Sequence, residues 1–130
     1  MNALFNGGGI SAPAENDGSG VKETWLDNVV VLTASGALDL LTTPRLQDAI
    51  DVAATKAPDA ILVDLSELEF LASAGMNALV AAHHKITPSA RFAVVADGAA
   101  TARPLKLLGI DKVVALYPAV SDALQALTHR

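Results

Sequence analysis

The chain of 130 residues contains no cysteine, which excludes disulfide bonds, thiol catalysis and thiolate metal sites. It also lacks a basic stripe of the kind that binds nucleic acid, because its nine Lys and Arg residues are scattered singly and its net charge is −5. No apolar run reaches the length that crosses a bilayer, and the N-terminus has neither the basic start nor the apolar core of a signal peptide. We therefore expect a cytoplasmic protein with no nucleic-acid partner and no membrane partner.

Aromatic residues are also scarce, at 4% of the chain, so a core has to be built from Val, Leu, Ile and Ala. The apolar content of 52% and the charged content of 18% are typical of a globular protein, and the length suits one domain. Five of the nine glycines fall within residues 1–20, which we predict to be a flexible tail. Residues 21–130 are predicted to form the single domain.

Short apolar runs, which suit strands, alternate along this domain with stretches whose apolar residues recur at helical spacing. Thr43-Pro44 is typical of a helix start, with threonine as the N-cap and proline as the first helical residue. Gly109 suits the C-terminal cap of a later helix. The predicted strands are 21–26, 29–34, 60–65, 91–96 and 113–116, and the predicted helices are 44–57, 73–86, 100–108 and 120–127.

The resulting β-β-α-β-α-β-α-β-α order predicts an α/β fold with a mixed, mostly parallel sheet and crossover helices. In such sheets, ligands and partners meet the loops at the carboxyl ends of the strands. Two loops qualify best: one from Gly36 to Asp39 and one from Ser66 to Ala72. If their strands are parallel neighbours joined by the first helix, Asp39 and Ser73 lie on the same edge of the sheet.

Ser73 is the leading candidate for a functional residue, because it stands where an apolar strand runs through a short loop into a helix. Backbone N–H groups at a helix start lack intrahelical partners, so a phosphate on this hydroxyl would be well placed. The plain alternative is that Ser73 is only an N-cap. Asp39 has a similar alternative, since it could simply cap the turn before the first helix.

Several segments together resemble the STAS domain, which bacterial anti-sigma factor antagonists share with sulphate transporters. The resemblance covers about residues 21–128, and its motifs are Gly36-Ala-Leu-Asp39, Ile61-Leu-Val-Asp-Leu-Ser66, Phe70-Leu-Ala-Ser-Ala-Gly75 and Leu105-Lys-Leu-Leu-Gly109. It implies a regulator rather than an enzyme, with no cofactor or metal of its own. The implied partner is an anti-sigma factor that is also a serine kinase, and a serine phosphatase would reset the system.

The same resemblance implies that the kinase phosphorylates Ser73, whereupon the phosphoprotein releases its partner. Asp39 matches an aspartate near the phosphorylated site. Family members typically carry an aspartate and a hydroxyl residue beside the serine, whereas this chain has alanine on both sides. The partner-binding residues expected at this edge are Asp39, Leu71, Ala72, Ala74, Gly75, Met76 and Asn77.

Two alternative functions stay open from the sequence. The two alanines beside Ser73 favour a constitutive binding or scaffold module of the same fold, one that phosphorylation does not control. A small hydrolase is the other alternative, but the leading glycine of a G-x-S-x-G elbow is missing and no histidine follows on a late loop. Leu71 and Met76, although counted among the contacts, are apolar residues of a type that more often packs in a core.

Overall fold

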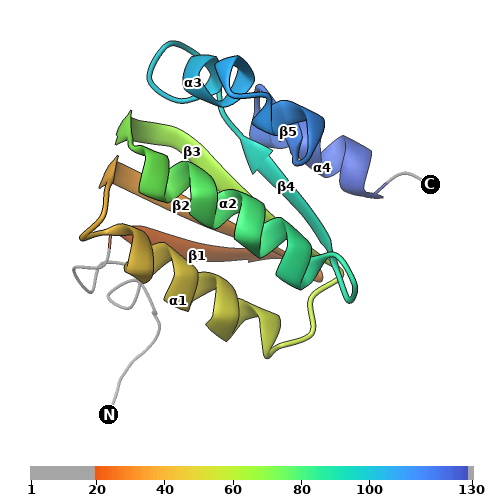
Figure 1. The fold of residues 1–130 in the computed structure, drawn as a ribbon. Helices are drawn as coiled ribbons and strands as arrows, with labels where there is room; N and C mark the ends of the chain where they lie inside the picture. The colour runs from red at the N-terminus through yellow and green to blue at the C-terminus, as the bar shows by residue number, and fades with distance from the viewer. Residues whose placement is uncertain (1–19, 129–130) are drawn as a thin grey trace.

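A computed structural model describes residues 20–128 of the protein (Figure 1). The predicted tail over residues 1–20 falls outside the described part except for Gly20, as do residues 129–130. The described residues form a five-stranded sheet in the order β1-β2-β3-β4-β5, with four α-helices and one short 3-10 helix. The elements are β1 (Val21–Leu26), β2 (Val29–Leu38), α1 (Thr43–Ala54), β3 (Ala60–Leu71), α2 (Ser73–Ile86), β4 (Arg91–Val95), α3 (Ala102–Leu107), η2 (Ile110–Lys112), β5 (Ala115–Tyr117) and α4 (Val120–Thr128).

The sheet is mixed in the way the sequence predicts. β1 and β2 form an antiparallel hairpin around a turn in which Asp27 adopts a positive φ of 56°. The pairs β2–β3, β3–β4 and β4–β5 are parallel, and each of them requires a crossover connection. The predicted α/β class, element order and hairpin are thus confirmed.

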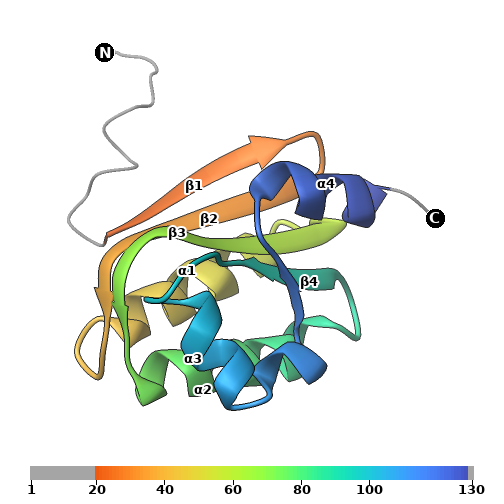
Figure 2. The ribbon, with the colours of Figure 1, turned by 90° about the horizontal axis from the view of Figure 1, so that it is seen from above.

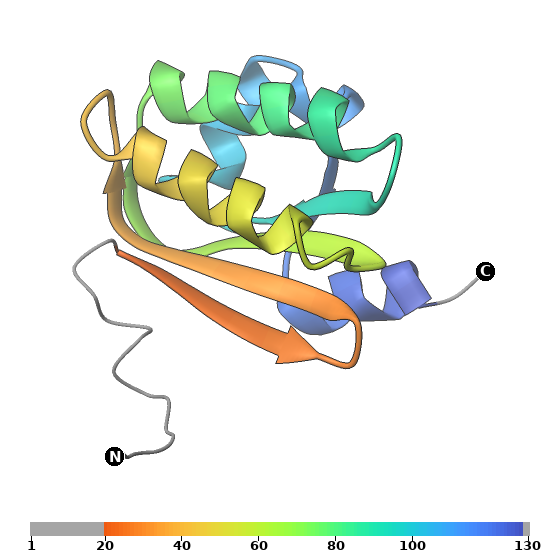
Figure 3. The same cartoon turned by 90° about the horizontal axis from the view of Figure 1, so that it is seen from below.

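Both faces of the sheet are covered, so the central strands β2 and β3 are nearly continuous apolar runs. Figures 2 and 3 show α1, α2 and α3 on one side of the sheet and α4 on the other. Successive side chains of each strand therefore enter different cores: Val30 and Leu32 pack with α1 and α2, whereas Val31 packs with α4. Ala123 of α4 is fully buried in this second core, and Val120, Leu124 and Leu127 pack against it.

Two predicted loops are partly strand. β2 continues past Ala34 to Leu38, and β3 continues past Leu65 to Leu71. The two extensions pair with each other in parallel, with register shifts between Thr33 and Ser35 and between Gly36 and Ala37. The prediction of a loop over Ser66 to Ala72 is therefore wrong, because irregular pairing carries polar residues of this segment into the sheet.

Smaller boundaries also differ from the predictions. The N-cap of α1 is Thr42 rather than Thr43, and Thr43 is a buried first helical residue. Ala57 lies beyond the end of α1, where its φ of 53° stops the helix before Pro58. Gly109 has a φ of 74°, so it ends α3 in the left-handed conformation predicted for a cap. None of the helices in residues 20–128 combines the length and apolarity needed to cross a membrane.

Candidate functional site

Ser73 is the first residue of α2, at the carboxyl end of β3, and its side chain is exposed. The N-cap is the preceding residue, Ala72, whose backbone is extended. The first intrahelical hydrogen bond runs from the amide of Met76 to the carbonyl of Ala72 at 3.1 Å. The amides of residues 73–75 therefore precede the helical ladder, and Ser73 stands among them without being the cap.

The start of α2 carries none of the usual features that satisfy a helix N-terminus. Ala72 has no side-chain oxygen, no side-chain cap bond forms, and the first turn contains no acidic residue. No side chain of the first turn of α2 thus compensates the partial positive charge of the helix start. An anionic group on the Ser73 hydroxyl would lie near the amides of residues 73–75, in a helical turn that contains no carboxylate.

Gly75 allows α2 to approach the end of β2 closely. An added Cβ at this position would lie 3.0 Å from Leu38 Cβ and 3.3 Å from the Leu38 carbonyl oxygen. The same strand end accepts a hydrogen bond of 2.9 Å from the amide of Ala72 to the carbonyl of Leu38. These contacts join the two segments that precede Asp39 and Ser73, so the prediction that both residues lie on one edge is confirmed.

Asp39 organises the turn between β2 and α1. Its Oδ1 accepts hydrogen bonds from the amides of Leu41 (2.9 Å) and Thr42 (3.0 Å) and from the Thr42 hydroxyl (3.0 Å). The amide and hydroxyl donors of Thr42, helped by the Leu41 amide, hold the pKa of the Asp39 carboxyl below its usual value. The Thr42 hydroxyl is also 2.7 Å from the carbonyl of Ala37, so the turn is closed on both sides.

The expected contact residues divide by burial. Leu71, Gly75 and Met76 are buried, and the two apolar side chains belong to the main core cluster. Ala72 and Ala74 are half-buried, while Asn77 is exposed one turn into α2. The surface that a partner could touch here is therefore made by Ser73, Asn77 and the two alanines. Leu71, Gly75 and Met76 lie beneath it and support the backbone.

Sequence reasoning missed three exposed apolar side chains at the same edge. Leu40 and Leu41 follow Asp39 in the turn and are 80% and 83% exposed, and Phe70 near the end of β3 is 55% exposed. Phe70 pairs with Ala37 of β2, which places it beside the strand that leads into this turn. Because isolated loop leucines follow no strand or helix period, only their adjacency to Asp39 could have drawn attention to them.

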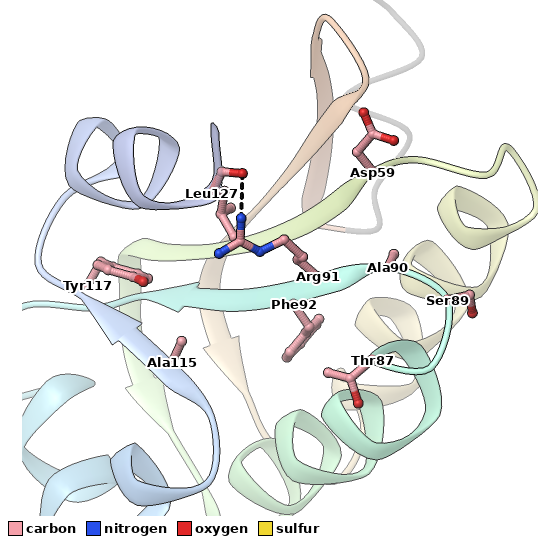
Figure 4. Close-up of a pocket in the computed structure, with 9 residues that line it drawn as sticks. All are labelled: Asp59, Thr87, Ser89, Ala90, Arg91, Phe92, Ala115, Tyr117 and Leu127. Carbon is pink, nitrogen blue, oxygen red and sulfur yellow. Dashed lines mark hydrogen bonds between the residues drawn. The ribbon is translucent and has the colours of Figure 1, made fainter. Parts of the chain in front are cut away.

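The opposite edge of the sheet contains a hollow of about 480 Å³, lined by residues such as Arg91, Tyr117 and Thr87 (Figure 4). The Arg91 guanidinium donates hydrogen bonds to the carbonyls of Leu127 (2.7 Å) and Ala126 (3.3 Å). Its charge thus caps the C-terminal end of α4, which is a structural role. Figure 4 shows Arg91 and Thr87 pointing to different sides of β4, so the lining does not converge on one ligand.

Comparison with known proteins agrees with this architecture. Residues 21–118 match the family model described as Mlab, STAS domain. The chain is 42% identical over 98 residues to the anti-sigma-F factor antagonist RsfB of Mycobacterium tuberculosis H37Rv, covering 75% of this chain and 80% of that protein.

The fold is also similar to those of solved structures. An anti-sigma factor antagonist from Mycobacterium paratuberculosis superimposes with a TM-score of 0.80 at 40% identity, over 84% of this chain and 93% of that one. The Bacillus cell fate determinant SpoIIAA, solved in its phosphorylated form, superimposes with a TM-score of 0.62 over 82% of this chain and 98% of that one. At 14% identity, this second likeness shows the fold alone.

Proposed function

This chain belongs to the STAS domain family, and we propose that it is a cytoplasmic anti-sigma factor antagonist controlled by phosphorylation of Ser73. In this proposal it binds an anti-sigma factor through the edge that carries Asp39, Ser73 and the start of α2. Binding leaves the sigma factor free to join RNA polymerase. The chain acts by contact and catalyses no reaction of its own.

The observation that carries the proposal is the exposed hydroxyl of Ser73 at an uncapped helix start. A kinase can reach this oxygen without unfolding the domain. The first turn of α2 contains neither an acid nor a side-chain cap, so the amides of residues 73–75 are available to a phosphate.

The proposed modification is a phosphoryl transfer for which the kinase supplies ATP. The Ser73 oxygen attacks the γ-phosphorus, the bond to the β-phosphate oxygen breaks, the hydroxyl proton passes to a base or solvent, and ADP leaves. The product carries about −1.5 to −2 charges near neutral pH, with three strong acceptor oxygens. A partner surface that covers Ser73 would have to strip water from this group, so the phosphorylated protein dissociates. A serine phosphatase would restore binding.

Binding of Ser73 variants to a purified anti-sigma factor tests the proposal. A suitable probe is the anti-sigma-F factor of Mycobacterium tuberculosis, since the 42% identical relative RsfB is named as its antagonist. We expect Ser73→Ala to bind like the wild type and Ser73→Asp to lose binding. With ATP and the probe, we expect a mass gain of one phosphoryl group that maps to Ser73.

Ser121→Asp is the matched control, because Ser121 is an exposed residue in the first turn of α4, on the other side of the sheet. It adds the same charge at another helix start and should leave binding unchanged. If the wild type and Ser73→Asp bind equally and no phosphoryl group is gained, the alternative of a constitutive scaffold module is correct. If the wild type itself does not bind, the proposed function fails.

A further inference from the structure

Leu40 and Leu41 are the two most exposed large apolar side chains in the described part of the chain, at 80% and 83%. A single exposed leucine is ordinary in a soluble protein. Two adjacent ones at the tip of a turn form an apolar projection that carries a cost unless something covers it. We name Leu40 and Leu41 the apolar rim.

The turn that carries the two leucines is held rigidly. The Asp39 carboxylate accepts bonds from the amides of Leu41 and Thr42, and the amide of Thr43 donates to the Asp39 carbonyl at 2.9 Å. The Asp39 amide in turn donates to the Thr42 hydroxyl at 2.9 Å. Hydrogen bonds of Asp39 and Thr42 thus fix the backbone of the turn, while the side chains of Leu40 and Leu41 stay exposed.

Rigidity of this kind favours association, because a loop that is already ordered pays little further conformational entropy when it binds. Fully desolvated apolar side chains at the centre of an interface also contribute most of the binding energy in protein complexes. The turn therefore has the two properties of a binding anchor, namely apolar area and a fixed conformation.

The position of the rim next to Ser73 identifies its occupant. The end of β2 and the start of α2 are joined by the hydrogen bond between Ala72 and Leu38, so a partner that covers Ser73 also reaches the residues that follow Leu38. The first turn of α2 carries no charged side chain. The two exposed leucines therefore offer apolar contact area beside the hydroxyl.

We propose that Leu40 and Leu41 insert into an apolar cleft of the anti-sigma factor, with Asp39 and Thr42 as positioning residues. This inference rests on the proposed function and gives its switch a physical basis. An apolar cleft that closes over the two leucines brings low-dielectric surface against Ser73. A neutral hydroxyl is tolerated there, whereas a hydrated phosphate is not.

The test measures binding of the full chain to the purified anti-sigma-F factor of Mycobacterium tuberculosis. We expect Leu40→Ser/Leu41→Ser to weaken binding about 30-fold, because each buried anchor contributes about fivefold or more. The matched control is Leu26→Ser/Val52→Ser, which removes two other exposed apolar side chains far from this edge and should bind like the wild type. Both double variants replace exposed residues, and equal urea midpoints will show that they fold.

A double-mutant cycle tests the positioning role separately. Asp39→Ala should weaken binding about fivefold or more in the wild type and much less in the Leu40→Ser/Leu41→Ser background, because it acts through the two leucines. An Asp39 that touches the partner directly would give equal effects in both backgrounds, which would overturn the positioning role. If the Leu40→Ser/Leu41→Ser variant binds with the affinity of the wild type, the inference is overturned and the proposed function still holds. If the wild-type protein does not bind, both are overturned.

Discussion

Replacing Gly75 by alanine probes the close approach between α2 and β2 on which the Ser73 edge depends. The new Cβ would meet Leu71 Cδ1 at 2.9 Å, Leu38 Cβ at 3.0 Å and the Leu38 carbonyl oxygen at 3.3 Å. The Leu71 methyl group is the end of a flexible side chain and can rotate away. The two Leu38 atoms belong to the backbone or are fixed to it, so α2 or the end of β2 has to shift.

Two opposing contributions decide whether Gly75→Ala raises or lowers the stability of the fold. Overpacking of this kind costs about 1–3 kcal/mol. Alanine is favoured over glycine inside a helix by at most about 1 kcal/mol, and by less at the third helical residue. We therefore expect Gly75→Ala to lower the free energy of unfolding by about 1–2 kcal/mol, because the clash exceeds the gain in propensity. The midpoint of thermal unfolding should fall by about 4–8 °C.

Urea unfolding followed by circular dichroism measures this difference, and Ala81→Gly calibrates it. Ala81 is exposed on the same helix, so its replacement reports the cost of a glycine in α2 without any change in packing. We expect that variant to lose about 1 kcal/mol. A Gly75→Ala protein as stable as the wild type, or more stable, would refute the argument that the glycine is there for a close approach.

Three further predictions concern other charged or modified positions. The carboxylate of Asp39, with its lowered pKa, stabilises the fold above its unfolded pKa of about 3.9, and this contribution is lost as the pH falls through the folded value. The urea midpoints of Asp39→Ala and wild type should thus differ near neutral pH and converge as the pH falls below the lowered pKa of Asp39. A difference that does not change with pH would contradict this. Ser73→Asp should stabilise the protein by about 0.3–1 kcal/mol, because it adds an acid to a helix start that has none, and high salt should reduce the gain; a destabilised variant would contradict this. Arg91→Ala should lower the free energy of unfolding by about 0.5–1 kcal/mol, because the C-terminal cap of α4 is lost. Arg103→Ala, on the exposed surface of α3, should leave the free energy of unfolding unchanged. Equal losses in the two variants would argue against the cap.

The fold was predictable where the pattern of apolar residues in a segment matches the burial of that segment in the folded protein. The apolar runs at Val29 and Ala60 become central strands because helices cover both faces of the sheet. The positive φ at Gly109 needs no tertiary information. The extension of β3 to Leu71 was not predictable, since Ser66 and Glu67 look like loop residues. Glu67 pairs with Ser35 of β2 only because the register shifts there.

The candidate site was predictable in part for the same reason. The position of Ser73 at a helix start follows from the change of periodicity, and its shared edge with Asp39 follows from parallel topology. The sequence could not show that Thr42 rather than Thr43 is the N-cap, because the difference depends on bonds from Thr42 back to Ala37 and Asp39. Nor could it show the apolar rim, since exposure is a property of the folded surface.

The two ends of the described chain lie at opposite ends of the sheet. Gly20 accepts a hydrogen bond from the amide of Ser35, close to the Ser73 edge, whereas α4 ends beside Arg91 at the far edge. A tether to a sensor chip or a fluorescent label joined after α4 therefore leaves the proposed partner surface open. Gly20 itself lies close to that edge, so a C-terminal attachment is the orientation in which association rates best report the domain itself.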